Sequence, residues 1–263
     1  LPSLVNGVVL GAIDKYFCES GQARAGLTAL YEWTFLDAGK SSDCEVSETR
    51  PFITTWNLTG VDNPTNEIII PTYNVEENGN FLNYDYNIDW GDGTIENNVK
   101  ETISHIYSSP GEYKVLITGK FPRIYFAESG SNSKMLQSID QWGDIEWSTM
   151  QDAFASCSNV DVLAKDVPNL SNVTDTSNMF LNCESLVGSS KFNKWNVSTL
   201  QKVDGMFEGT TLFNQILSNW DTSLITNMSA MFKDSGFKNS LGTWDVSQVT
   251  TMNQMFIGSQ LTT

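Results

Sequence analysis

Histidine and positive charge are scarce in this sequence. His105 is the only histidine, which excludes a histidine-based catalytic triad and a multi-histidine metal site within the chain. The 263 residues contain 15 Lys and Arg against 31 Asp and Glu, a net charge of −16. A nucleic-acid-binding protein needs a basic face to displace counterions from phosphates, so we expect no nucleic-acid partner. The same charge argues against binding to anionic membrane surfaces.

Long apolar runs and a targeting segment are also missing. The longest apolar stretches have the length of strands, far from the roughly 18 residues of a membrane-spanning helix, so we expect no membrane insertion within this chain. Residues 1–4 contain neither an initiator Met nor a basic residue, so a signal peptide is not present in this chain. We expect the chain to begin at an internal or mature cut of an exported protein.

Residues 50–126 have the pattern of short strands. Segments 52–56, 67–71, 84–88 and 113–117 are rich in β-branched and aromatic residues or alternate with period two. Strands at this spacing, separated by turn signals, predict an antiparallel β-sandwich in which residues 89–94 form an exposed turn. Residues 1–49 fit neither a helical nor a strand pattern, and we treat them as a separate N-terminal segment.

The rest of the chain repeats itself. Five units of 24–27 residues align on an anchor residue and on a Phe twelve residues later, and positions within a unit are numbered here from the anchor. The anchors and their phenylalanines are Trp142 with Phe154, Pro168 with Phe180, Trp195 with Phe207, Trp220 with Phe232, and Trp244 with Phe256.

The apolar positions of a unit have helical spacing. Positions 5, 8 and 12 are mostly apolar, and the last four units have Ser at position 3, where it would serve as a helix N-cap. A short strand is predicted upstream of the anchor, most clearly at 213–219 and 237–243. One strand and one short helix per unit cannot bury their own apolar faces, so the pattern predicts stacked copies in a solenoid with parallel strands.

Two segments resemble known families. Asp89-Trp90-Gly91-Asp92-Gly93-Thr94, followed by His105-Ile106-Tyr107 and by a Pro-Gly-x-Tyr-x-Val segment at 110–115, resembles the polycystic-kidney-disease (PKD) type of immunoglobulin-like domain, although Ile88-Asp89-Trp90 departs from that family's usual Trp-Asp-Phe. The unit 244–256 fits Trp-Asp-Val-Ser-x-Val-Thr-x-Met-x-x-Met-Phe. That pattern resembles the BspA-like leucine-rich repeats of bacterial surface proteins, in a subfamily first catalogued in mycoplasmas.

These observations predict a mixed β and α/β fold class: an immunoglobulin/PKD-like β-sandwich followed by a leucine-rich-repeat-like solenoid of five units. The expected divisions are an N-terminal segment at 1–49, a docking piece or partial domain, then the sandwich at 50–126 and the solenoid at 127–263. No capping unit follows the fifth repeat, so we expect the solenoid to continue beyond the end of this chain.

The cysteines and the acidic turn are expected to be structural. Cys18 and Cys44 are a disulfide candidate in an exported protein, with two buried thiols as the open alternative. Cys157 and Cys183 stand one unit apart and are interpreted as small buried hydrophobes. Asp92 is expected to cap turn amides, because the segment lacks the Asp-x-Asp-x-Asp-Gly spacing of a calcium loop.

The sequence contains no nucleophile with a base, no phosphate loop and no metal cluster. We therefore predict a protein that is not an enzyme and has no cofactor and no metal site. The leading hypothesis is a non-catalytic, extracellular or cell-surface protein for adhesion to a protein or glycan on another surface. The alternative is a structural component of a larger assembly, such as a surface filament, a phage tail fibre or a contractile injection machine, that docks to neighbouring subunits through residues 1–49.

The strand face of the solenoid is the predicted binding surface. If the upstream strands alternate, Phe213, Leu217, Phe237 and Leu241 point inward. The residues then predicted to point outward and bind are Asn214, Ser218, Lys238 and Gly242, with Lys191 and Asn193 assigned through an insertion.

Overall fold

The computed structural model describes residues 9–12, 34–37, 49–59, 65–75, 79, 81–127 and 130–261. The chain divides into two compact parts, Leu1–Pro51 and Phe52–Thr263. In the N-terminal part, β1 (Val9–Ala12) pairs in parallel with β2 (Thr34–Asp37). Cys18 and Cys44 lie outside the described residues, so their disulfide stays a prediction.

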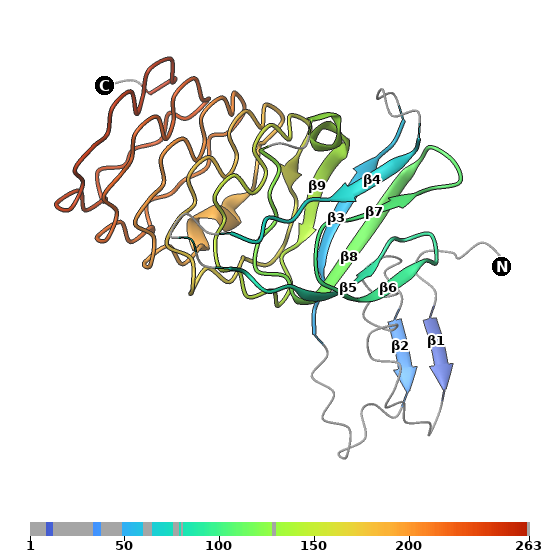
Figure 1. Ribbon diagram of the computed structural model, residues 1–263. Coiled ribbons are helices and arrows are strands. Elements are labelled where there is room, and N and C mark those ends of the chain that lie inside the picture. The colour runs from blue at the N-terminus through green and yellow to red at the C-terminus, as the bar shows by residue number, and fades with distance from the viewer. Residues whose placement is uncertain are drawn as a thin grey trace. The chain divides into compact units, whose positions relative to one another are not determined.

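The C-terminal part, Phe52–Thr263, begins with two β-sheets (Figure 1). A six-stranded sheet has the order β10-β9-β3-β8-β5-β6, and a two-stranded sheet pairs β4 with β7 in antiparallel fashion. The strands of the large sheet are β3 (Phe52–Asn57), β5 (Asp85–Asp89), β6 (Ile95–Val99), β8 (Glu112–Lys120), β9 (Leu136–Gln141) and β10 (Asp161–Val162), and those of the small sheet are β4 (Glu67–Ile70) and β7 (Ile103–Ile106).

The large sheet joins the first repeat directly. β9 lies just upstream of the first anchor and pairs antiparallel with β3, while β10 follows the first repeat phenylalanine and pairs in parallel with β9. Along β5, Tyr86 and Ile88 are buried and their neighbours are not, so the alternation seen in the sequence places one face of the strand in the core. The predicted domain division at 126/127 stays a prediction, although β9, on one side of it, pairs with β3, on the other.

The predicted fold class is wrong. The described residues form strands in sheets, with no α-helix, and the repeats are not an α/β leucine-rich-repeat solenoid. The only helical turns among them are two short 3₁₀ segments, η1 (Gly130–Met135) and η2 (Ser190–Lys194). Segments 213–219 and 237–243, predicted as strands, are irregular.

A backbone conformation that recurs in every unit explains why no helix forms. Positions 10 and 14 have positive φ in all five units, whereas an α-helix requires negative φ throughout. The residues concerned are Asp152, Ser156, Asn178, Asn182, Gly205, Gly209, Ala230, Asp234, Gln254 and Gly258. Each unit therefore makes consecutive tight turns, in which the N–H groups at positions 11 and 15 donate to the carbonyls at positions 8 and 12, at 3.0–3.3 Å. Because these turns bring residues three apart onto one side, they account for the apolar spacing that we interpreted from the sequence as one face of a helix.

Successive units stack through their backbones (Figure 1). In each of the first four units the N–H groups at positions 8, 10, 12 and 14 donate to carbonyls of the following unit, at 2.7–3.1 Å. Positions 11 and 15 donate within their own unit, so the N–H groups along this stretch alternate between turn bonds and bonds to the next unit. This alternation satisfies the backbone of a buried, non-helical segment.

Aromatic rings form the core of the stack. The repeat phenylalanines make one continuous column with centroid separations of 5.6–5.9 Å and interplanar angles of 13° or less. A second column runs from Trp195 through Trp220 to Trp244, at 6.5 and 6.0 Å. The indole N–H groups of Trp220 and Trp244 donate to the carbonyls of Phe192 and Leu217. The helical spacing of the repeated Trp and Met residues predicts that they belong to the core rather than to a ligand site, and this is confirmed, because the four Trp anchors and the Met residues at position 11 are buried.

The serine at position 3 is not a helix cap. Its N–H and its hydroxyl both donate to the side-chain oxygen of Asn or Asp at position 1, as in Ser198 with Asn196 and Ser223 with Asp221. This is an Asx turn immediately after the anchor. The Asn/Asp-x-Ser pattern of the repeat therefore encodes a turn.

Candidate functional site

Positions 6 to 9 of the repeats form a ladder along one side of the stack. Isolated parallel bridges link position 7 of one unit to position 7 of the next, from Asp175 through Lys202 and Asn227 to Thr251. From the second unit onward, the carbonyl at position 6 accepts the N–H groups of positions 6 and 7 in the following unit, as Thr174 does for Gln201 and Lys202. Positions 7 and 9 are two apart, so their side chains share one face.

That face, here called the polar ladder, is hydrophilic in every unit. Its side chains are Thr149 and Gln151, Asp175 and Ser177, Lys202 and Asp204, Asn227 and Ser229, and Thr251 and Asn253. None of them is apolar or aromatic, while the intervening position 8 is buried in the first four units. The ladder thus presents two columns of hydrogen-bonding groups on a backbone that stacking holds in place.

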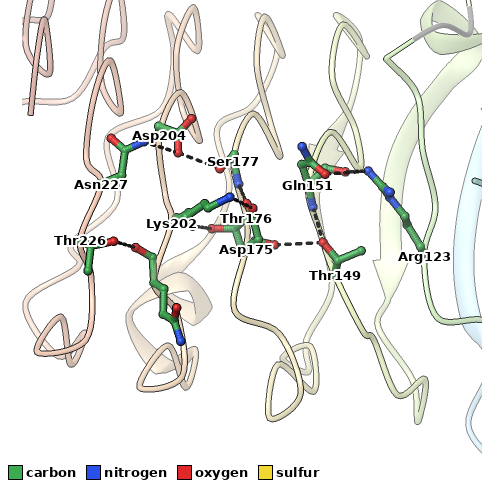
Figure 2. Close-up of polar contacts among 11 residues, drawn as sticks. Arg123, Thr149, Gln151, Asp175, Thr176, Ser177, Lys202, Asp204, Thr226 and Asn227 are labelled. Atoms are coloured by element: carbon green, nitrogen blue, oxygen red, sulfur yellow. Dashed lines mark hydrogen bonds and ion pairs between the residues drawn. The ribbon is translucent and has the colours of Figure 1, made fainter. Parts of the chain in front are cut away.

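The ladder side chains contact one another across the units (Figure 2). The Lys202 ammonium lies 3.3 Å from the Asp175 carboxylate. Asp204 accepts hydrogen bonds from the Ser177 hydroxyl at 2.8 Å and from the Asn227 amide at 2.9 Å. Bonds on both sides fix the Asp204 carboxylate, so this part of the surface is held in one arrangement in the absence of a ligand.

Arg123 fixes the start of the ladder to the segment that follows β8. The side chain is 2% exposed and its guanidinium lies 5.2 and 4.6 Å from the ring centroids of Tyr73 and Tyr125. It donates to the Val75 carbonyl at 3.0 Å, and to the backbone and side-chain oxygens of Gln151 at 3.2 and 3.1 Å (Figure 2). Gln151 is a ladder residue, so Arg123 joins the sheets to the first rung.

The structure does not bring the predicted binding residues into this ladder. They lie between the phenylalanine of one unit and the anchor of the next, where Phe213, Leu217 and Phe237 are buried as predicted and Leu241 is partly buried. Within that stretch Lys238 and Gly242 are exposed, Asn214 and Ser218 are half-buried, and Lys191 and Asn193 belong to η2. Their assignment as binding residues stays a prediction.

Two of these residues support the neighbouring unit. Asn214 accepts the Lys238 N–H at 3.0 Å and the Asn239 side-chain amide at 2.9 Å. Asn193 accepts the Asn219 N–H at 2.9 Å. The signal that would have identified the ladder instead is the polar character of positions 7 and 9 in all five units, which is visible in the sequence.

Changing Asn214 to Ala is expected to lower the free energy of unfolding by about 1–2 kcal/mol, because the Lys238 N–H loses its acceptor. Changing exposed Lys238 to Ala leaves that backbone bond in place and should alter the free energy of unfolding by less than about 0.5 kcal/mol. Urea unfolding of the two variants measures the difference. Equal stabilities would show that the Asn214 side chain does not support the following unit.

The acidic turn between β5 and β6 is built as expected. The Asp89 and Asp92 side chains accept the N–H groups of Gly91 and Thr94, each at 2.9 Å. His105 Nε2 lies 2.7 Å from Asp92 Oδ2, and the imidazole stacks on Trp90 at 5.1 Å. The capping role predicted for Asp92 is therefore confirmed, Asp89 caps a second amide of the turn, and His105 is held by its contact with Asp92.

The environment of Asp92 lowers the pKa of its carboxyl group. Partial burial raises this pKa, but the hydrogen bonds from His105 and Thr94 together outweigh it. A lowered pKa in the folded state means that ionised Asp92 stabilises the fold above the unfolded-state pKa of about 3.9. The stabilisation is lost as the pH falls through the lower, folded-state value.

The variant Asp92→Asn is therefore expected to show a weaker loss of stability on acidification than the original chain. At pH 7 it should also be less stable by about 1–2 kcal/mol, because two charge-assisted hydrogen bonds are weakened. Unfolding free energies measured between pH 7 and pH 3 give both results. If the two pH profiles run parallel below pH 4, Asp92 does not carry this dependence.

Cys157 and Cys183 occupy equivalent positions in adjacent units. Both side chains are fully buried and unbridged, and the Cys183 thiol donates to the Phe154 carbonyl at 3.1 Å. Burial raises the pKa of both thiols. They contribute to the core as small apolar groups, as the sequence predicts.

No group of three or more His, Cys, Asp or Glu side chains in the described part of the chain could hold a metal ion. No helix among the residues that the structure describes is long and apolar enough to cross a membrane.

The repeats match one family model. Residues 148–262 match the family described as "Mycoplasma protein of unknown function, DUF285", a region that covers the ladder from Thr149 to Asn253. The comparisons with curated proteins and with solved structures give no match. The chain is thus similar to this family over its repeats, while the resemblance of 89–115 to a PKD domain stays a prediction.

Proposed function

We propose that this chain is part of an exported surface protein that binds a macromolecule on another surface through the polar ladder, without catalysis. The observation that carries the proposal is the polar ladder itself, two columns of hydrogen-bonding side chains that run through every unit at positions 7 and 9. The similarity of the repeats to the Mycoplasma family is compatible with a location at the cell surface.

The chemistry of the ladder favours a polar polypeptide surface as the ligand. Carbohydrate sites usually offer exposed aromatic rings, but the Trp anchors of this stack are at most 9% exposed and no ladder residue is aromatic. The Lys202 ammonium pairs with the Asp175 carboxylate of the preceding unit, and the Asp204 carboxylate follows two residues later on the same face. Mixed charge on a fixed backbone suits a ligand that offers complementary charges in a fixed order.

A binding screen of the whole chain against extracellular-matrix proteins and glycans identifies the ligand. Changing Lys202 to Gln together with exposed Asn253 to Trp is then expected to weaken binding at least about tenfold, through loss of a charge and added bulk on the ladder. The matched control is Lys238→Trp, which adds the same bulk at an exposed residue of the originally predicted face.

Four outcomes separate the hypotheses. Loss of binding only in the ladder variant supports the proposal, and loss only in Lys238→Trp would favour the predicted residues between the units. Loss of binding only on deletion of residues 1–49 would favour the assembly component that docks through that segment. Turnover of a substrate that is lost on changing one carboxylate would overturn the non-catalytic proposal.

A further inference from the structure

The polar ladder has no aromatic residue, but two exposed aromatic side chains lie on the segment between β4 and β5. Tyr73 is 45% exposed and Phe81 is 74% exposed. An antiparallel bridge pairs Val75 with Phe81, and the Leu82 N–H donates to the Asn74 carbonyl at 2.8 Å. Around this bridge the chain forms a two-stranded ribbon. Tyr73, two residues before Val75, is then a diagonal neighbour of Phe81, a spacing that aromatic side chains can span.

The Tyr73 ring is held from one side. It stacks on the Tyr125 ring at a centroid distance of 4.8 Å, and the Arg123 guanidinium lies 5.2 and 4.6 Å from the two centroids. These three distances place Tyr125 and Arg123 on the same side of the Tyr73 ring. Arg123 is fixed in turn by hydrogen bonds to the Val75 carbonyl and, as Figure 2 shows, to Gln151. The exposed surface of Tyr73 is therefore the other face and the edge of a ring that is already fixed in position.

The backbone that carries this ring is held as well. The Tyr84 hydroxyl accepts the Tyr73 N–H at 3.3 Å and lies 3.1 and 3.0 Å from the carbonyl oxygens of Tyr73 and Arg123. Tyr84 is 4% exposed, and burial raises the pKa of its hydroxyl to about 12, so the group stays protonated at neutral pH and can donate to a carbonyl. A ring fixed in this way loses little conformational entropy when a ligand binds.

The described residues of the ribbon carry no charge. Residues 71–75 and 81–84 include no Asp, Glu, Lys or Arg, in a chain with 31 acidic residues and a net charge of −16. The polar side chains beside the rings are neutral, with Asn74 and Asn83 exposed and Thr72 half-buried. Apolar ring faces next to amide and hydroxyl groups suit a neutral ligand that has an apolar face and many hydroxyl groups.

We propose that this ribbon is a second binding site, for a neutral glycan whose pyranose rings stack on Tyr73 and Phe81. The C–H face of a pyranose ring is apolar and its rim carries hydroxyl groups. One sugar ring can therefore cover an aromatic face while its hydroxyls bond to the amides of Asn74 and Asn83. The site lies apart from positions 7 and 9 of the repeats, and it does not depend on the function proposed for the polar ladder.

A proline-rich polypeptide is the main alternative occupant, because proline rings also pack against exposed aromatic side chains. Proline side chains carry no hydroxyl groups, so they would leave the exposed amides of Asn74 and Asn83 with fewer partners than a sugar does. The observations therefore favour a glycan, and the experiment includes both ligands.

The test is isothermal titration calorimetry of the whole chain with three neutral β-1,4-linked hexasaccharides, of glucose, of mannose and of N-acetylglucosamine. At least one of them is expected to bind with a Kd below about 1 mM. Tyr73→Ala should weaken this binding at least about tenfold and Phe81→Ala at least about threefold, because each variant loses a stacking ring. Tyr73→Phe keeps the ring and should bind within about twofold of the original chain.

Two controls locate the binding. Ile95→Ala removes a 60% exposed apolar side chain of β6 and should leave glycan binding unchanged. The ladder variant, Lys202→Gln with Asn253→Trp, should also bind the hexasaccharide as the original chain does, so this site and the ladder can fail independently. The fold is expected to survive Tyr73→Ala, because the Tyr84 hydroxyl contacts the backbone of residue 73, which alanine retains.

Binding that is weakened in Tyr73→Ala and Phe81→Ala but kept in Tyr73→Phe and in the ladder variant supports the proposal. Absence of binding by all three hexasaccharides overturns it, as does binding that neither alanine substitution weakens or that the ladder variant loses. Binding of a polyproline decapeptide, but of no hexasaccharide, would overturn it in favour of a polypeptide.

Discussion

Changing Phe207 to Ala is expected to lower the free energy of unfolding by about 3–5 kcal/mol. Phe207 is fully buried at the centre of the ring column, 5.9 Å from Phe180 and 5.7 Å from Phe232. Its ring also stacks on Phe213 at 4.2 Å. Removal of the ring leaves a cavity that backbone bonds on both sides prevent from collapsing.

Chemical denaturation of the whole chain, followed by tryptophan fluorescence, measures this loss. The control is Phe81→Ala, because Phe81 is 74% exposed and its truncation should change the free energy of unfolding by less than about 0.5 kcal/mol. A loss below about 1 kcal/mol for Phe207→Ala would show that the units do not depend on a continuous column.

The burial within each unit was predictable from the sequence, but its backbone was not. Apolar residues at positions 5, 8 and 12 recur through the chain, and in the first four units these positions are buried. The same spacing fits a helix and a series of tight turns, because residues three apart share a face in both. Ser156, Ala230 and Gln254 adopt positive φ although residues of these types rarely do so, and the residue type therefore does not mark the turns in every unit.

The candidate site was missed for a related reason. The prediction placed the strands upstream of the anchor, where Asn214 and Asn193 in fact hold the next unit, while the parallel bridges form at position 7. Positions 7 to 9 are too short a segment for strand alternation to stand out within one unit, and only the recurrence of polar residues at positions 7 and 9 in all five units indicates the ladder. By contrast, the Gly-Asp-Gly-Thr turn was predictable, since Asp92 and His105 carry side-chain chemistry that specifies a local structure.

A substitution in that turn gives the second large expected loss of stability. Its two glycines both have positive φ, but they differ in what surrounds them. Gly91 and Gly93 have φ of +78° and +98°. A Cβ on Gly91 would collide with the backbone carbonyl of Lys114 in β8, whereas a Cβ on Gly93 would meet nothing within 4 Å. Gly93→Ala is therefore expected to cost only the positive-φ strain, about 1–2 kcal/mol.

Gly91→Ala adds a collision with a central strand of the sheet, and we expect it to cost about 3 kcal/mol or more in total. Because both variants add one methyl group to the same turn, the difference between their unfolding free energies isolates the contact with β8. Urea unfolding measures both, and His105 side-chain resonances in NMR spectra report whether the turn keeps its Asp92 contact. Equal losses would mean that the turn moves away from β8 at little cost, and that the sheet does not require its close approach.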